Sequence, residues 1–128
     1  MYEDQYTIVQ DVVAPGGEYG EHSHLVDFQT QQLLSQLWTQ YLASIRAELP
    51  PTDVGQVVRR VSYQLDSEAF AGDALQRGIR VERRSRRSCT FGVALWQAGD
   101  GRMVHSGEII TVFVEPGKGS VEIPGNFW

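Results

Sequence analysis

The chain has 128 residues, 41% of them hydrophobic and 21% charged, as is typical of one soluble globular domain. Its apolar runs fall far short of the roughly 18 residues of a membrane span, and its net charge of −5 argues against wholesale nucleic-acid binding. Cys89 is the single cysteine, which excludes an intramolecular disulfide and argues against a cysteine-based structural zinc site. The acidic residues 1–5 do not resemble a signal peptide, so we expect a cytoplasmic protein.

A strand and a long helix open the chain. β-Branched and aromatic residues predict a strand over Tyr6–Val13, and the Pro-Gly-Gly turn at 15–17 ends it. Apolar residues then recur at steps of three and four, which predicts an amphipathic helix over Leu25–Glu48. Ser23 is its candidate N-cap, and the paired prolines at 50–51 stop it. The stripe expected to face the core consists of Leu34, Leu37, Trp38, Tyr41, Leu42 and Ile45.

The remainder of the chain predicts four long strands, over Val57–Leu65, Leu75–Arg84, Ser88–Gln97 and Met103–Glu115. Alternation predicts that one face of the first of them carries Val57, Val61, Tyr63 and Leu65. The last strand is apolar on both faces, which predicts a central position or cover by another subunit. No repeat or linker interrupts the chain, so we expect a single α+β domain over residues 1–128.

The start of the helix is unusually polar. Extending the apolar stripe backwards lands on Thr30 and Asp27, so the core-facing side becomes polar where the helix begins. A helix N-terminus offers free N–H groups and a positive dipole end, which suit a developing oxyanion. The preceding segment, 18–24, adds acids and imidazoles. The competing interpretation is a first turn that simply protrudes into water.

A second polar feature is a basic segment at 77–87. It holds six of the 11 basic residues and a single acid, Glu82. A local basic patch on an acidic protein suits a discrete phosphate-bearing ligand, although a solvated arginine-rich turn explains it equally well.

Three short motifs lie in the second half of the chain. They are a Gly-Asp-x-Leu turn at 72–75, Ser88 opening the next strand, and an Asp-Gly-x-x-Val-x-x-Gly segment at 100–107. With the order of elements, they resemble the hot-dog fold, in which a curled antiparallel sheet wraps one long central helix. The resemblance covers nearly the whole chain, and its motifs are similar to acyl-CoA thioesterases of the 4-hydroxybenzoyl-CoA thioesterase type.

The resemblance implies hydrolysis of an acyl thioester carried by coenzyme A or by an acyl carrier protein. A carboxylate near the helix N-terminus would attack the thioester or activate water, and the helix N–H groups would polarise the carbonyl. The site would lie between two protomers of a homodimer or homotetramer. Coenzyme A would enter as part of the substrate, with no other cofactor, no metal and no nucleic-acid or membrane partner.

Carried onto this sequence, neither acid signature of the family is intact. Asp27 or Glu21 is the expected nucleophile or general base, Glu18 is third, and His24 would orient the carbonyl or the water. An acid at a helix start is also a favourable dipole partner without any catalytic role, and a histidine there is often a solvated cap. His105 falls within a strand and is expected to be structural.

The arginines are the expected contacts to the phosphates of coenzyme A, through bidentate guanidinium–phosphate bonds. The candidates are Arg83, Arg84, Arg86 and Arg87, together with Ser88. Two alternatives stay open. One is a non-catalytic hot-dog module that binds acyl-CoA or serves in assembly. The other is a hot-dog dehydratase or hydratase, disfavoured because its histidine–acid pattern is missing.

Overall fold

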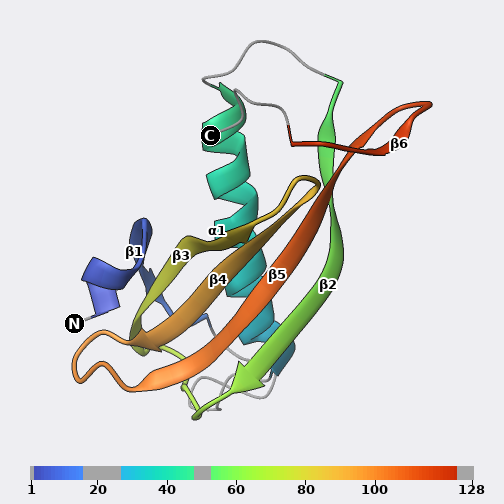
Figure 1. The fold of residues 1–128 in the computed structure, drawn as a ribbon. Coiled ribbons are helices and arrows are strands. Elements are labelled where there is room, and N and C mark those ends of the chain that lie inside the picture. The colour runs from blue at the N-terminus through green and yellow to red at the C-terminus, as the bar shows by residue number, and fades with distance from the viewer. Residues whose placement is uncertain (1, 16–26, 48–52, 124–128) are drawn as a thin grey trace.

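The computed structural model describes residues 2–15, 27–47 and 53–123 (Figure 1). One long helix packs against an open antiparallel sheet, which confirms the predicted α+β hot-dog architecture. The elements are η1 (Tyr2–Gln5), β1 (Ile8–Val13), α1 (Asp27–Ala47), β2 (Gly55–Leu65), β3 (Ala74–Arg84), β4 (Ser88–Gln97), β5 (Met103–Glu115) and β6 (Gly119–Val121). No helix among the described residues is long and apolar enough to cross a membrane.

The core lies between α1 and the inner face of the sheet. Leu34 and Leu37 are fully buried, as the periodic stripe predicts, and α1 packs mainly against β3 and β4. Trp38 and Tyr41 approach the ring of Phe91 edge-on, with ring centroids 6.4 and 6.0 Å away. The helix therefore obtains its stability from apolar burial against the sheet.

The sheet order is β1-β3-β4-β5-β2, with β6 paired to β5. The predicted central position of Met103–Glu115 is confirmed, because β5 pairs with β4, β2 and β6. The predicted bounds of the strands lie within two residues of those observed. The short strand β6 was not predicted, since its three residues are too few to show alternation. Of the predicted helix, residues 25, 26 and 48 lie outside the described residues.

The prediction that Val57 shares a face with Val61 is wrong. Val57 pairs with Val112 and Val61 with Ile109, and partners three residues apart on one strand point to opposite faces. The cause is a register shift between Val58 and Arg60, where the extra residue of a bulge reverses the alternation. β2 is also an edge strand, and several of its apolar side chains are exposed.

The chain before β1 lies against the outer face of the sheet. The Tyr6 ring stacks on the Trp96 ring, with ring centroids 5.4 Å apart. The guanidinium carbon of Arg80 lies over the Tyr6 ring, 4.9 Å from its centroid. Gly78 leaves room for this ring, because a Cβ there would lie 2.6 Å from Tyr6 Cγ. Arg80 also donates to the carbonyl of Gln5, so η1 is fixed to β3.

Candidate functional site

The predicted catalytic residues precede or open α1 in the sequence. Glu18, Glu21 and His24 lie outside the described residues. Asp27 is the first residue of α1, and the position of its side chain is not described. These four assignments therefore stay predictions.

A buried polar pair occupies the end of the first turn of α1. Thr30 and His105 are each only 1% exposed, and Thr30 Oγ1 shares a hydrogen bond with Nδ1 of His105. When the imidazole is protonated on Nε2, the hydroxyl donates; when it is protonated on Nδ1, the ring donates. The bond joins α1 to β5 in a core that is otherwise largely apolar. His105 thus lies in its predicted strand, but its contact with the helix start was not predicted.

Tyr63 of β2 extends this pair to the edge of the sheet. Its ring meets the His105 imidazole edge-on, with centroids 5.0 Å apart and planes at 75°. Its hydroxyl lies 3.5 Å from Ser35 Oγ of α1. Tyr63 reaches across Gly107, where a Cβ would lie 2.3 Å from the carbonyl oxygen of Ser62 and 2.5 Å from Tyr63 Cδ1. One contact chain therefore links α1, β5 and β2.

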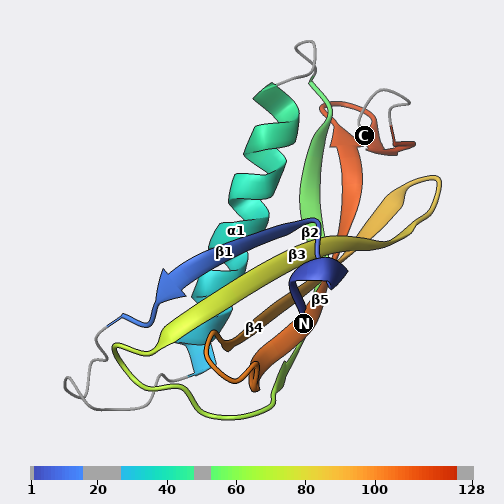
Figure 2. The ribbon, with the colours of Figure 1, turned by 90° about the vertical axis from the view of Figure 1, so that its left-hand side faces the viewer.

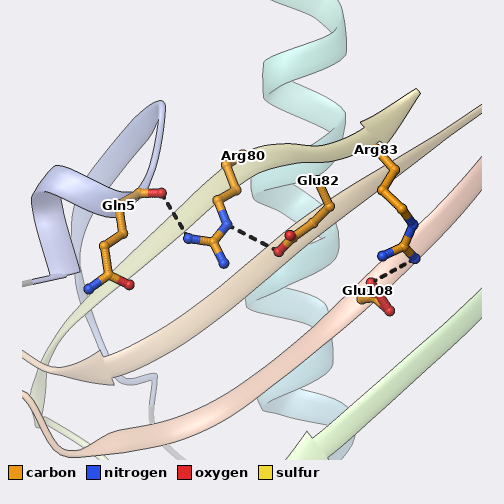
Figure 3. Close-up of polar contacts among 5 residues, drawn as sticks. All are labelled: Gln5, Arg80, Glu82, Arg83 and Glu108. Carbon is orange, nitrogen blue, oxygen red and sulfur yellow. Dashed lines mark hydrogen bonds and ion pairs between the residues drawn. The ribbon is translucent and has the colours of Figure 1, made fainter.

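The predicted phosphate-binding arginines surround the β3–β4 turn. Arg83 is 65% exposed and forms an ion pair with Glu108 at 3.2 Å (Figure 3). Arg86 is 80% exposed and pairs with Glu122, whose hydrogen bond raises the pKa of Arg86 and lowers that of Glu122. Arg87 donates to the carbonyl of Ser120 at 3.4 Å. The turn is exposed, and acids partly neutralise its charge.

Arg84 and Ser88 flank the same turn. Arg84 is exposed at the end of β3, and its charge opposes the burial that raises the pKa of Cys89 to about 12. Ser88 is half-buried, and its hydroxyl lies 2.6 Å from that of Ser85. Ser88 therefore shapes the turn through Ser85.

A groove of about 390 Å³ crosses the outer face of the sheet beside these arginines. Its charged lining residues are Arg80, Glu82 and Glu108, and Figure 3 shows that Arg80 pairs with Glu82 at 3.1 Å and that Glu108 pairs with Arg83. Gly92 also lines the groove, and the Glu82 carboxylate lies against it, since a Cβ there would be 2.1 Å from Glu82 Oε1. Both acids of the lining are paired with an arginine, Glu82 with Arg80 and Glu108 with Arg83.

The helix start and the arginine turn do not meet within one chain. Arg84 pairs with Cys89, and Cys89 pairs with Thr111 on β5. His105 and Thr111 are six residues apart, roughly 20 Å along an extended strand. Figures 1 and 2 show the two features at opposite ends of the molecule. Among the described residues, no three His, Cys, Asp or Glu side chains lie together as a metal site would require.

No family model matches the sequence, and no curated protein matches it. Solved structures do match the fold. The PA5185 protein of Pseudomonas aeruginosa is 22% identical and has a TM-score of 0.78, over 97% of this chain and 88% of that one. A thioesterase superfamily protein of Jannaschia sp. is 20% identical with a TM-score of 0.78, over 95% and 79% of the two chains.

A third match is a variant of 4-hydroxybenzoyl-CoA thioesterase, complexed with 4-hydroxybenzoyl-CoA. It is 15% identical and has a TM-score of 0.75, over 94% of each chain. The chain therefore has the hot-dog fold of solved thioesterase superfamily structures.

Proposed function

We propose that this protein is an acyl thioesterase that hydrolyses the thioester of an acyl-CoA or an acyl carrier protein. The observation that carries the proposal is the match of more than nine tenths of the chain to solved thioesterases. Two of the matched proteins were solved with coenzyme A or an acyl-CoA bound, which supports coenzyme A as the carrier.

The chemistry follows from the start of α1. The first N–H groups of a helix have no acceptor within it, and the helix dipole makes this end positive. Both favour the oxyanion that forms when a thioester carbonyl is attacked. A thioester is already activated, so one carboxylate acting as nucleophile or general base suffices without a full triad. The position of Asp27 at the first residue of α1 supports it in this role, with Glu21 and Glu18 as the other candidates.

The site is proposed to lie between two protomers. Val58, Val61 and Leu65 of the edge strand β2 are 45%, 44% and 55% exposed. Their pairing with Thr111, Ile109 and His105 puts all three on the side of the sheet that faces α1. An edge strand with exposed apolar side chains is a template for pairing with another chain, so we infer a homodimer, alone or within a homotetramer.

Dimerisation along β2 would also complete the site. If two β2 edges pair antiparallel about a two-fold axis, the Leu65 end of one lies beside the Gly55 end of the other. In each protomer the helix start is level with Leu65, and the arginine turn is level with the Gly55 half. The helix start of one protomer would thus face the arginine-bearing end of its partner. The exposed Arg84 and Arg87 would then contact the phosphates of coenzyme A.

The direct test is hydrolysis of short, long and aromatic acyl-CoAs, followed with a thiol-trapping dye. We expect turnover with at least one class, and Asp27→Asn and Glu21→Gln then identify the acid. Turnover that survives both changes would overturn the site assignment and leave the function standing. No hydrolysis of any acyl-CoA in the panel would overturn the proposed function.

The incomplete acid signature favours one second candidate, a module that binds acyl-CoA without hydrolysing it. That candidate predicts binding of coenzyme A that weakens with salt and with Arg84→Ala, in the absence of turnover. Sizing in solution tests the dimer, since a stable monomer would contradict a site between protomers.

A further inference from the structure

We propose that His105 is a positioning residue, which holds the first turn of α1 in the orientation that hydrolysis requires by its hydrogen bond to Thr30. The inference rests on the proposed function, because it assigns a role in that reaction. It concerns residues whose side chains are described, unlike the predicted catalytic acids.

The burial of the pair is the first argument. Both side chains are 1% exposed, so water cannot replace the hydrogen bond if either partner is removed. Leucine or valine would fill the same space and spare the desolvation of an imidazole and a hydroxyl. The buried polar pair therefore fixes the orientation of the helix start more closely than apolar packing would, because a hydrogen bond depends on direction and apolar contact does not.

The location of the pair is the second argument. Thr30 is the fourth residue of α1 and thus belongs to the first turn of the helix, the positive end of its dipole, which favours a developing oxyanion. His105 holds that turn against β5, the strand that also pairs with β2 and β4. The imidazole is supported in turn by Tyr63, at 5.0 Å between ring centroids. The helix start is therefore tied to the most extensively paired strand of the sheet.

The chain offers a matched control on the same strand. Thr111 is fully buried on the inner face of β5, and its hydroxyl donates to Gln56 Oε1 at 2.7 Å. Thr111→Val and Thr30→Val each delete one buried hydroxyl with little change in volume. Thr111 lies six residues from His105 on β5 and its hydroxyl bonds to β2, so only Thr30→Val removes a bond to the helix start.

The experiment compares kcat and KM for the best acyl-CoA substrate in these variants. Thr30→Val should lower kcat about 10- to 100-fold with KM changed less than about twofold, because misorientation affects the transition state more than ground-state binding. Thr30→Ser, which keeps the hydroxyl, should stay within about threefold of wild type, as should Thr111→Val. His105→Asn, which keeps a nitrogen near the position of Nδ1, should retain more activity than His105→Leu. An equal kcat in Thr30→Val and Thr111→Val would overturn the proposal.

A wild-type protein without turnover would overturn the proposed function, and amide hydrogen exchange would then decide the structural half of the inference. The amides of residues 31–34 bond to the carbonyls of the first turn. Exchange at these amides that is faster in Thr30→Val than in Thr111→Val supports His105 as the anchor of the helix start. The same exchange rate in both variants refutes it.

Discussion

Two glycines on neighbouring strands should respond very differently to alanine. At Gly107 a Cβ would lie 2.3 Å from the carbonyl oxygen of Ser62, which belongs to the backbone of β2. At Gly92 the Cβ would come closer still, 2.1 Å, but to the carboxylate oxygen of Glu82. The distances alone predict that Gly92→Ala destabilises the fold more than Gly107→Ala. The reverse is expected because the backbone of β2 cannot move aside as easily as the flexible Glu82 side chain.

The magnitudes follow from what has to move. A carbon and a carbonyl oxygen settle at about 3.3 Å, so Gly107→Ala must push β2 away by about 1 Å. Overpacking of this kind costs about 2–3 kcal/mol. Gly92→Ala only rotates Glu82 away and weakens its ion pair with Arg80, which is worth at most about 1 kcal/mol at the surface.

The assay is equilibrium unfolding in urea, read as a change in midpoint at constant m-value. Gly99→Ala is the control, because no heavy atom lies within 4 Å of its Cβ position and its φ is not positive. We expect Gly99→Ala to match wild type, Gly92→Ala to lose less than about 1 kcal/mol, and Gly107→Ala to lose about 2–3 kcal/mol. A Gly92→Ala protein as destabilised as Gly107→Ala would refute the reasoning.

Three further predictions concern groups with shifted pKa values. Burial raises the pKa of Cys89 to about 12, so at pH 8 the thiol should resist alkylation in the folded protein and react on unfolding; rapid labelling of the native state contradicts this. Arg77 is 7% exposed, its pKa is lowered by burial, and it donates to the carbonyl of Leu33. Because Arg77→Ala leaves this buried carbonyl without its donor, we expect the free energy of unfolding in urea to fall by about 2–4 kcal/mol. A decrease below about 1 kcal/mol would show that the buried hydrogen bonds of Arg77 are dispensable. The backbone N–H of Phe70 and then Gln97 hold the pKa of Asp73 below its ordinary 3.8, so its stabilising contribution is present at neutral pH and is lost as the pH falls below that value. The difference in melting temperature between wild type and Asp73→Asn should shrink on acidification; a difference independent of pH would exclude this linkage.

The periodicity of apolar residues predicted the helix and the strands because the buried positions follow the same period. The stripe of α1 and the alternation of β3 and β4 face a single core, so their apolar residues repeat as the geometry requires. β2 departs from this rule. As an edge strand with a bulge, it carries apolar residues on both faces, and the sequence pattern does not reveal the extra residue between Val58 and Arg60.

The site was less predictable than the fold. Thr30 was visible as a polar break in the apolar stripe, but its partner is 75 residues away and only the pairing of β5 brings His105 to it. The arginines were conspicuous as a run, whereas the acids that pair with Arg83 and Arg86 lie on β5 and beside β6. Contacts between distant segments depend on register, which a sequence pattern does not determine.

The place of β2 in the sheet has a consequence for how the chain reaches its native state. β3, β4 and β5 are consecutive hairpins and pair with near neighbours in sequence, so this meander is expected to form early. β2 precedes them in the chain, and its one partner among the described strands is β5, so β2 cannot pair until residues 103–115 have been synthesised. During that interval its valines and its free edge are open to other molecules. The strand that the proposed dimer uses is therefore also the point at which a nascent chain is most exposed to aggregation.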